Sequence, residues 1–311
     1  MGVADNLRSA VKSMLRPFTD VRGAGRVCGL VNRIFLACGA TRTPTANMRD
    51  GTRMVVDVRT KTEWFAYYTG RYDDDVVDLI VRLLGNGGHF LDVGGNIGMY
   101  AVRVACRTPP NCQAWCFEPV PTNADRILCN AQINNVEQRV LIHRIALSDT
   151  NGSVKIVLRE DFQTGSATGN ASVEISDEID GKFDTIEADM KPLDEVRAEL
   201  SMPAIDVIKV DIEGHEDYFF RGASASIERD KPFIFTEINN YFYRNRNAST
   251  GGVFKDALPS EYGSFILNTK TSRFEAIAFE NLDDLVGVHN VLLLPTSRAD
   301  QLQQQLPEWS I

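Results

Sequence analysis

The chain of 311 residues lacks a long hydrophobic run. Its longest apolar stretch near the N-terminus, residues 27–40, is interrupted by Asn32 and Arg33. That stretch is shorter than the roughly 20 residues that a helix needs to span a bilayer. We therefore expect neither a transmembrane helix nor a signal peptide.

The six cysteines lack the CxxC spacing of redox and metal motifs. Cys112 and Cys116 stand four positions apart, but no second pair and no nearby histidine completes a zinc site. Buried, reduced thiols are the simplest interpretation. They indicate a reducing compartment and predict a cytoplasmic location.

Positive charge is scarce outside the N-terminal segment. The chain has 42 Asp and Glu against 33 Lys and Arg, a net charge of −9. Residues 1–42 hold seven Lys or Arg against Asp5 and Asp20, a net of +5, so the remainder carries −14. Because nucleic acids are polyanions, this acidic body argues against nucleic acid as a substrate.

A small basic amphipathic helix is predicted at the N-terminus. Leu7, Val11, Leu15 and Phe18 recur at helical spacing, with basic residues beside them. We expect this helix to dock through its apolar side on the protein's own surface. Contact of residues 1–40 with a membrane surface or an acidic partner is the alternative.

The composition favours one large domain with short additions. With 43% hydrophobic residues, the chain can bury one large core. We predict an N-terminal helical extension over residues 1–50, a main domain over 51–295, and a poorly ordered C-terminal tail over 296–311. Residues 160–188, which are polar, are predicted to form a substrate lid over the carboxyl ends of the strands.

Short apolar runs alternate with helical segments from about residue 54, which predicts an α/β fold with a doubly wound sheet. Helices are predicted over residues 74–84, up to residue 105, and over 123–134. The predicted strands cover residues 54–58, 89–93, 114–118, 140–143, 153–158, 205–211, 233–237, 264–267 and 291–294.

The sharpest local motif is Phe-Leu-Asp-Val-Gly-Gly-Asn-Ile-Gly over residues 90–98, a strand that enters a tight glycine turn. Glycines let the backbone approach a ligand closely. Asn96 and Met99 stand where the dinucleotide fingerprint has its later glycines, which disfavours a nicotinamide cofactor. The motif instead resembles Asp-x-Gly-x-Asn-x-Gly, a nucleoside-binding loop of class I methyltransferases.

Two carboxylates accompany this turn. Glu118 ends the next predicted strand, 20 residues beyond Gly98, where it can accept hydrogen bonds from both ribose hydroxyls. Asp92 precedes the turn, where it would complement the amino group of a methionine moiety. Alternatively, Asp92 caps a helix or stabilises the turn, and the two roles are compatible.

A second motif, Lys-x-Asp-x-Glu-Gly-x-Glu over residues 209–216, narrows the family. With the glycine turn, it resembles the FkbM-type O-methyltransferases over roughly residues 65–240. The resemblance implies a mostly parallel, Rossmann-like class I methyltransferase sheet with helices on both faces. It implies S-adenosylmethionine as cofactor, and a hydroxyl of a sugar, glycan or polyketide-type small molecule as acceptor. The cofactor-binding residues would be Tyr72, Asp92, Gly94, Asn96, Gly98, Glu118, Pro119, Ala146 and Asp211.

The candidates for the base that takes the hydroxyl proton are His215, Asp211, Glu213 and Glu237. His215 is attractive because its ordinary pKa lies near neutrality, whereas the carboxyl groups need burial or clustering to become basic enough. As an alternative, His215 only orients a carboxylate. Lys209 is expected to be a buried ion-pair partner or a site residue.

A magnesium ion held by Asp211, Glu237 and Asn239 is an additional hypothesis, because hard cations prefer oxygen ligands. Glu237 would otherwise bind substrate hydroxyls or pair with Lys209. Competing functions are methyl transfer to a lipid-linked or protein acceptor recruited by the N-terminal helix, and cofactor binding without catalysis. The sequence leaves a homo-oligomer open.

Overall fold

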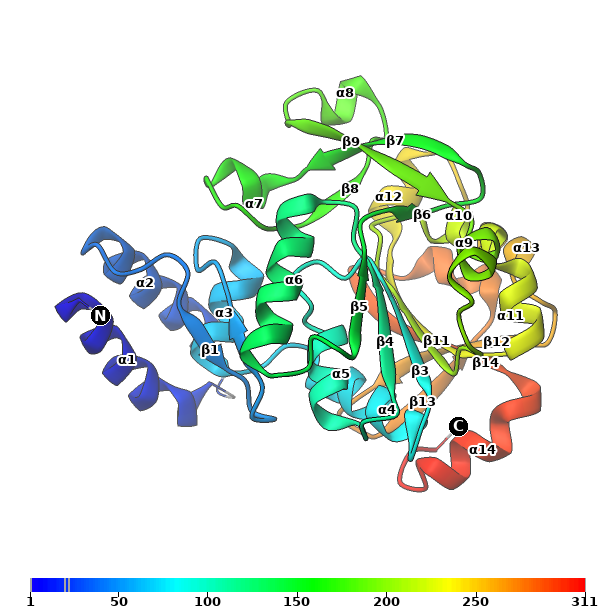
Figure 1. The fold of residues 1–311 in the computed structure, drawn as a ribbon, viewed down its shortest axis with the longest axis horizontal. Coiled ribbons are helices and arrows are strands. Elements are labelled where there is room, and N and C mark those ends of the chain that lie inside the picture. The colour runs from blue at the N-terminus through cyan, green and yellow to red at the C-terminus, as the bar shows by residue number, and fades with distance from the viewer. Residues whose placement is uncertain (1, 20, 22, 311) are drawn as a thin grey trace.

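The computed structural model describes residues 2–19, 21 and 23–310. An eight-stranded sheet forms the centre of the protein (Figure 1). In order across the sheet, its strands are β13 (Arg273–Ile277), β12 (Tyr262–Asn268), β14 (Val288–Pro295), β11 (Phe233–Asn239), β10 (Val207–Val210), β3 (His89–Val93), β4 (Gln113–Phe117) and β5 (Val140–His143).

Five neighbouring strands, from β11 to β5, run parallel to one another. Strand β10 lies between β11 and β3, and all four of its residues are buried, as an apolar interior strand requires. Strand β14 runs antiparallel to both β11 and β12, which gives the sheet an antiparallel edge. The predicted doubly wound, mostly parallel Rossmann-like sheet is confirmed.

Helices cover both faces of the sheet because side chains alternate along each strand. Phe90 and Phe235 join the core on one face, whereas Leu91 and Ile234 join the core on the other. The first face is covered by α4 (Asp74–Leu84), α5 (Ala101–Arg107), α6 (Pro121–Ile133) and α14 (Ala299–Gln305). The second is covered by α9 (Leu193–Leu200), α10 (Glu216–Gly222), α11 (Ser224–Asp230) and α13 (Thr250–Ala257). The short helices α12 (Asn240–Asn245) and η2 (Phe279–Asp284) complete this half, and η3 (Thr296–Arg298) precedes α14.

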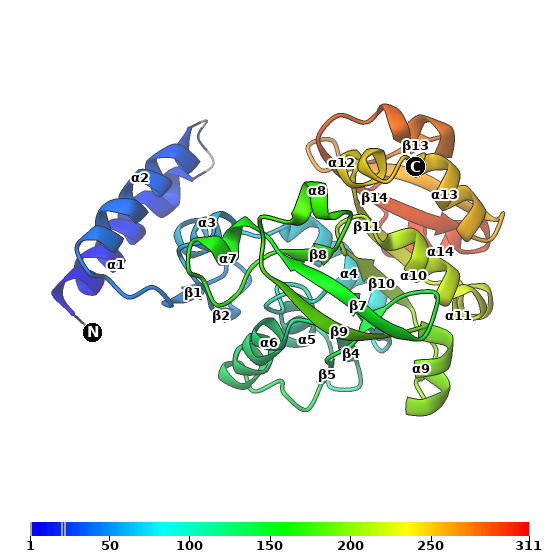
Figure 2. The ribbon, with the colours of Figure 1, turned by 90° about the horizontal axis from the view of Figure 1, so that it is seen from above.

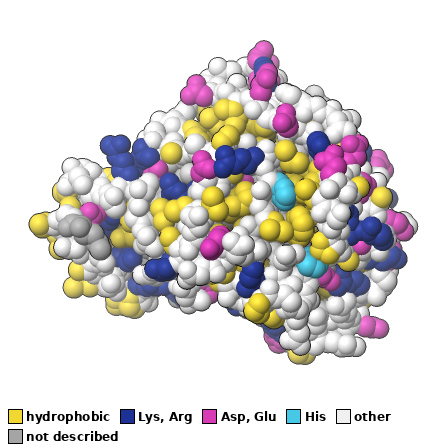
Figure 3. All heavy atoms as spheres, in the orientation of Figure 1, with side chains coloured by type: hydrophobic (Ala, Val, Ile, Leu, Met, Phe, Trp, Pro, Cys, Tyr) yellow, Lys and Arg dark blue, Asp and Glu magenta, His cyan; other side chains and the backbone are white. Residues whose placement is uncertain are grey.

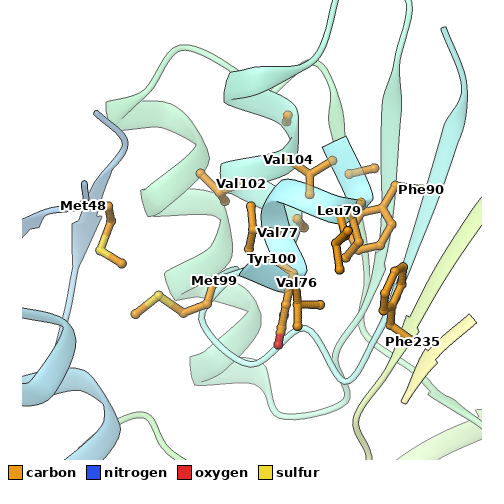
Figure 4. Packing of buried hydrophobic residues seen from close by; sticks show 14 of the residues in the cluster. Met48, Val76, Val77, Leu79, Phe90, Met99, Tyr100, Val102, Val104 and Phe235 are labelled. Carbon is orange, nitrogen blue, oxygen red and sulfur yellow. The ribbon is translucent and has the colours of Figure 1, made fainter. Parts of the chain in front are cut away.

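The first core is tightly filled where α4 and α5 meet the sheet (Figure 4). Leu79 of α4 and Val104 of α5 lie beside Phe90 and Phe235, and all four are almost fully buried. Burying one such side chain contributes roughly 1.5–3 kcal/mol. This layer fixes the strand ends that carry the site.

A second sheet of four strands lies above the main one (Figures 1 and 2). Its strands are β6 (Ala146–Leu147), β9 (Thr185–Lys191), β7 (Gly152–Leu158) and β8 (Ala171–Val173), with α7 (Glu160–Gln163) and α8 (Asp177–Asp180) between them. We call residues 146–191 the cap. Most of the predicted insertion, residues 160–188, is therefore folded structure rather than loop.

The N-terminal segment forms a helical hairpin of α1 (Val3–Leu15), η1 (Arg16–Phe18) and α2 (Ala24–Ala37) that packs on α3 (Lys61–Thr69) (Figure 2). The short strands β1 (Thr45–Asn47) and β2 (Arg53–Val55) follow it. The first helix packs on α2 and α3, so it docks on the protein's own surface as expected, with Val11 and Leu15 half-buried. The side that it buries most deeply is not the apolar one. Leu7 and Phe18 are 58% and 64% exposed, whereas Arg8 and Lys12 are buried over the ring of Tyr67. Cation–π contacts and the aliphatic stems of the basic residues replace the expected apolar docking.

The expectation of a poorly ordered C-terminal tail is also wrong. Leu302 and Leu306 lie on one side of α14 and its end, and both are buried in the first core. The ring of Trp309 lies 4.7 Å from that of Phe274. Two leucines four positions apart were the helical signal, and the glutamines around them concealed it.

Two other expectations concern membranes and thiols. Within residues 2–19, 21 and 23–310, no helix is both long and apolar enough to cross a membrane. Cys28, Cys112 and Cys116 are buried free thiols, whereas the free thiol of Cys38 is exposed.

Candidate active site

A cavity of about 490 Å³ lies beneath the cap, where β3, β4, β10 and β11 end. Its lining combines the turn after β3, the acidic residues of β10 and β11, the tip of the cap and the start of α3. Among the predicted site residues, the lining includes Tyr72, Gly94, Asn96, Glu118, Pro119, Ala146, Asp211, Glu213, His215 and Glu237. Asp92, Gly98 and Asn239 do not line it.

The glycine turn is held in place by the backbone of its neighbours. The N–H groups of Gly94 and Gly95 donate to the carbonyl oxygen of Phe117, at 2.9 and 3.1 Å. Gly94 has a φ of +83°, and a Cβ there would overlap the carbonyl oxygen of Asp211. Only glycine therefore allows this turn to lie against both β4 and the end of β10.

Glu118 presents a buried carboxylate to the cavity. Its two oxygens accept hydrogen bonds from the N–H of Asn96, at 2.7 Å, and of Val120, at 2.9 Å. Burial raises the pKa of its carboxyl group to about 7, although these two hydrogen bonds by themselves would lower that pKa. The structure thus places Glu118 directly after β4, in the lining of the cavity.

Asp92 points away from the cavity. Its Oδ2 accepts a hydrogen bond of 2.9 Å from the N–H of Ala101, the first residue of α5. Burial raises the pKa of this carboxyl group to about 7. The geometry favours the predicted structural role of Asp92 at a helix start over contact with a cofactor.

Three carboxyl groups gather at the ends of β10 and β11. Asp211, Glu213 and Glu237 all line the cavity, and Glu213 has a left-handed φ of +53°. Burial and then the charge of Asp211 raise the pKa of both Glu213 and Glu237 to about 8. Burial and clustering therefore supply the basicity that the sequence alone did not guarantee.

Lys209 is the counterion inside this cluster. Its Nζ lies 3.2 Å from Oδ2 of Asp211 and 5.0 Å from the ring centroid of Tyr100, so the predicted buried ion pair is confirmed. Burial alone would lower the pKa of Lys209, but the charges of Asp211 and Glu237 outweigh it and raise the pKa. The ammonium group of Lys209 thus interacts with the charges of Asp211, Glu237 and Asp73.

His215 is engaged with the protein. Its Nε2 lies 3.0 Å from the hydroxyl of Ser148, and its ring stacks on Tyr218 with centroids 4.4 Å apart. Burial lowers the pKa of His215 to about 4. The imidazole is therefore neutral near pH 7 and is a weaker base than its ordinary pKa indicated.

The magnesium hypothesis gains no support. Among the described residues, no group of three or more His, Cys, Asp or Glu side chains is arranged to hold a metal ion. Asn239, one of the proposed ligands, instead accepts a hydrogen bond of 3.2 Å from the N–H of Tyr241 and caps α12.

The cap tip is tied to the body by residues that the sequence did not single out. Asn123 forms two hydrogen bonds with the backbone of Gly169, at 3.0 and 3.2 Å. The hydroxyl of Thr168 donates to Glu63 of α3 at 3.1 Å, and burial raises the pKa of Glu63 to about 7. Glu63 and Asn123 line the cavity. Thr168 and Glu63 lie in segments without apolar periodicity, and the pattern at Asn123 predicted a helix but no site residue.

Asp73 is a further lining residue on the opposite side of the turn. It has a φ of +41°, and its carboxylate accepts a hydrogen bond of 2.7 Å from the hydroxyl of Tyr100. The ring of Tyr100 packs edge-on against that of Tyr72. The sequence identified Tyr72 as a candidate site residue. The contact between Asp73 and Tyr100 joins separate segments, so only the fold reveals it.

Comparison with known proteins identifies the family. The profile described as the methyltransferase FkbM domain matches residues 92–268, which is more than half of the chain. The chain belongs to the FkbM methyltransferase family. It is therefore an S-adenosylmethionine-dependent methyltransferase, as the motifs predicted.

Two curated relatives and a solved structure accompany this FkbM assignment. The hexuronic acid methyltransferase AglP of Haloferax volcanii is 27% identical over 69% of this chain and 82% of its own length. The 2-O-methyltransferase NoeI of Sinorhizobium fredii is 28% identical over 48% of this chain. The match covers 63% of the length of NoeI, which is less than two thirds. The methyltransferase FkbM of Methylobacillus flagellatus KT has a TM-score of 0.42 at 16% identity, covering 67% of this chain and 44% of that one.

Proposed function

We propose that this protein transfers a methyl group from S-adenosylmethionine to a hydroxyl group of a sugar or glycan. The names of its relatives support this acceptor class, since AglP is a hexuronic acid methyltransferase and NoeI a 2-O-methyltransferase. The observation that carries the proposal is the pair Glu213 and Glu237. Both carboxyl groups line the cavity with pKa values raised to about 8.

The acidic lining favours a hydroxyl over a carboxylate as acceptor. A hydroxyl must lose its proton as it is methylated, and a carboxylate with a raised pKa accepts that proton more readily. An acceptor carboxylate has no proton to lose, so the proton acceptors Glu213 and Glu237 would have no role in its methylation. We therefore expect even a uronic acid to be methylated on a hydroxyl.

The residues around the turn fit the cofactor. When bound, S-adenosylmethionine supplies a methyl group on a positively charged sulfur. Gly94 and Gly95 keep side chains out of the turn, and Glu118 offers a buried carboxylate to ribose hydroxyls. The carboxylates beyond β10 complement a positive charge at that end of the cavity.

We assign proton acceptance to the pair Glu213 and Glu237. The charge of Asp211 raises the pKa of both carboxyl groups, and the two groups titrate as an interacting pair. The ammonium group of Lys209 lies 3.2 Å from the carboxylate of Asp211 and pairs with it. His215, neutral and bonded to Ser148, is assigned a positioning role.

We also propose that residues 160–188 of the cap act as a substrate lid. Gly169 and Asn170 line the cavity, and the tip is held by Asn123 and by the contact of Thr168 with Glu63. A lid that excludes water strengthens the electrostatic interactions beneath it. Opening would break these hydrogen bonds, those that Asn96 donates to Gly169 and Asn170, and the packing of the cap on Val120.

The test is a transfer assay with tritium-labelled S-adenosylmethionine and a panel of neutral and uronic acid-containing oligosaccharides. We expect the label to enter a methyl ether, which survives mild alkali. Label released by mild alkali would indicate a methyl ester and contradict the hydroxyl acceptor. Transfer to none of the saccharides, by protein that binds S-adenosylhomocysteine, would contradict the acceptor class.

A further inference from the structure

The outer side of the N-terminal hairpin carries an apolar surface that no described residue covers. Each of its side chains is between 48% and 86% exposed. Such a contiguous apolar surface commonly marks an interaction site. We call this surface the outer face; it consists of Val3, Leu7, Met14, Phe18, Val27, Leu30 and Ile34.

Helical periodicity makes the outer face continuous. Along α1, Val3, Leu7 and Met14 are spaced by four and seven residues, and the residues of α2 follow a spacing of three and four. The opposite sides of both helices, including Arg8 and Cys28, are buried. The hairpin stands away from the main body, at the end of the molecule where Figure 3 shows hydrophobic side chains beside Lys and Arg (Figures 2 and 3).

The charged side chains around the outer face are basic. Arg26 and Arg33 are exposed on α2, seven positions apart and thus on one side of the helix. The sequence of residues 1–42 contains seven Lys or Arg and two Asp. Of these two, Asp5 is described, and it is paired with Arg8 at 3.1 Å. The hairpin therefore presents apolar and cationic groups together.

This charge pattern disfavours a second copy as the occupant. A two-fold interface must be complementary to itself. Two outer faces brought together would approach with Arg26 and Arg33 on both sides, and the described part of the hairpin offers no exposed carboxylate to pair with them. The body of another copy carries −14, but such a head-to-tail contact builds a ring or a filament of many copies rather than a two-fold dimer.

We infer that the outer face docks on the surface of an anionic lipid bilayer. Apolar side chains would enter the boundary between headgroups and acyl chains, and the arginines would contact anionic headgroups. None of the described helices can cross a membrane, so the hairpin lies in the interface. The anionic bilayer repels the acidic body of the protein. This repulsion orients the protein with its hairpin toward the bilayer.

The hairpin is connected directly to the rim of the cavity. Phe65 of α3 lines the cavity, and a Cβ at Gly25 of α2 would lie 3.8 Å from its ring. Lys61, at the start of α3, lines the cavity too. Docking thus brings this rim near the bilayer, where the headgroup of a lipid-carried acceptor would be within reach. The inference itself does not depend on the acceptor proposed above.

Vesicle co-sedimentation tests the inference without any methyl transfer. We expect the full chain to bind phosphatidylcholine vesicles that contain phosphatidylglycerol, to bind pure phosphatidylcholine weakly, and to be released by high salt. Met14→Glu combined with Leu30→Glu should weaken binding more than tenfold. Arg26→Ser combined with Arg33→Ser should weaken binding to the anionic vesicles roughly 30-fold.

The matched control places the same charges on other exposed apolar residues. Val286→Glu combined with Leu200→Glu should bind vesicles like the wild type, since these residues lie outside the hairpin. Binding of S-adenosylhomocysteine verifies that each variant is folded. If the variant with Met14→Glu and Leu30→Glu does not fold, the variant with Arg26→Ser and Arg33→Ser still tests the inference. Undiminished binding by the hairpin variants overturns the inference. So does a dimer in light scattering that Met14→Glu and Leu30→Glu dissociate, without vesicle binding by the wild type.

Discussion

The two sides of the cavity are built by different physical means. On the turn side, at the ends of β3 and β4, the backbone bonds of Gly94 and Gly95 and the close approach to Asp211 fix the shape. On the acid side, at the ends of β10 and β11, Glu213 and Glu237 are defined by burial and mutual charge. Shape therefore governs cofactor binding, whereas protonation governs reactivity, and variants should separate the two.

The largest effect is expected on the acid side. Changing Glu213 and Glu237 together to Gln removes both proton acceptors while keeping their volume. We expect kcat to fall by about 10²–10⁴. Calorimetry should find nearly unchanged affinity for S-adenosylhomocysteine, because the turn side is intact. A double variant with wild-type kcat would contradict the assignment.

Gly94→Ala should break the turn side. The new Cβ overlaps the carbonyl oxygen of Asp211, and the left-handed φ of +83° adds strain. We expect affinity for S-adenosylhomocysteine to fall roughly 100-fold, with a loss of about 1–3 kcal/mol in unfolding free energy. Gly51→Ala is the control, because Gly51 has a φ of +89° and nothing within 4 Å. Equal effects at the two positions would show that strain alone is responsible.

Glu118→Ala tests the second component of the turn side. Hydrogen bonds to charged groups contribute about 1.5–3 kcal/mol, so affinity for the methyl cofactor should fall roughly 10- to 100-fold. The rate at saturating cofactor should change less than the affinity. Calorimetry with S-adenosylmethionine measures the affinity, and the transfer assay at saturating cofactor measures the rate. NAD is the negative control in calorimetry, because we expect it not to bind the wild type. Tight NAD binding would contradict the cofactor assignment.

A smaller effect is expected from His215→Gln. The pKa of His215 is lowered to about 4, so this residue does not titrate near pH 7. We expect kcat to fall less than roughly tenfold. The rate should rise with pH through about 8 in both proteins, as Glu213 and Glu237 lose their proton. An inflection near pH 6–7 that His215→Gln abolishes would restore His215 as the base.

The smallest expected effect is a change in stability with pH. The folded-state pKa values of Glu118, Glu213 and Glu237 are raised above the ordinary value, so the folded protein binds more protons than the unfolded chain. This stabilisation is complete below about pH 4 and is lost as the pH rises through 7 to 8. The melting temperature without ligand should therefore fall between pH 7 and pH 9. The Gln double variant should show a shallower decline.

The turn side could be predicted because its signal is local. A strand, a glycine turn and a carboxylate 20 residues later lie in one βα unit, so spacing alone brings Glu118 beside the turn. The three carboxylates of the acid side were also identified, since parallel strands end at the same edge. Their pKa values were not, because they depend on burial and on charges contributed by separate strands.

The cap side of the cavity could not be predicted in the same way. The contact of Thr168 with Glu63 joins residues 105 positions apart, and neither segment shows a hydrophobic period. The hairpin shows a further limit. Periodicity predicted a helix with an apolar side, but it could not say that Tyr67 would attract Arg8 and Lys12 instead.

The buried C-terminal residues matter for genetics and for protein production. Leu306 and Trp309 fill the core beside the edge strand β13, and the N–H of Phe274 donates to the carbonyl oxygen of Ser310. A premature stop codon shortly after residue 300 would remove a wall of the core and should abolish accumulation of folded enzyme. An affinity tag at this end needs a spacer, because the ring of Trp309 is buried against Phe274 only two positions before the last residue.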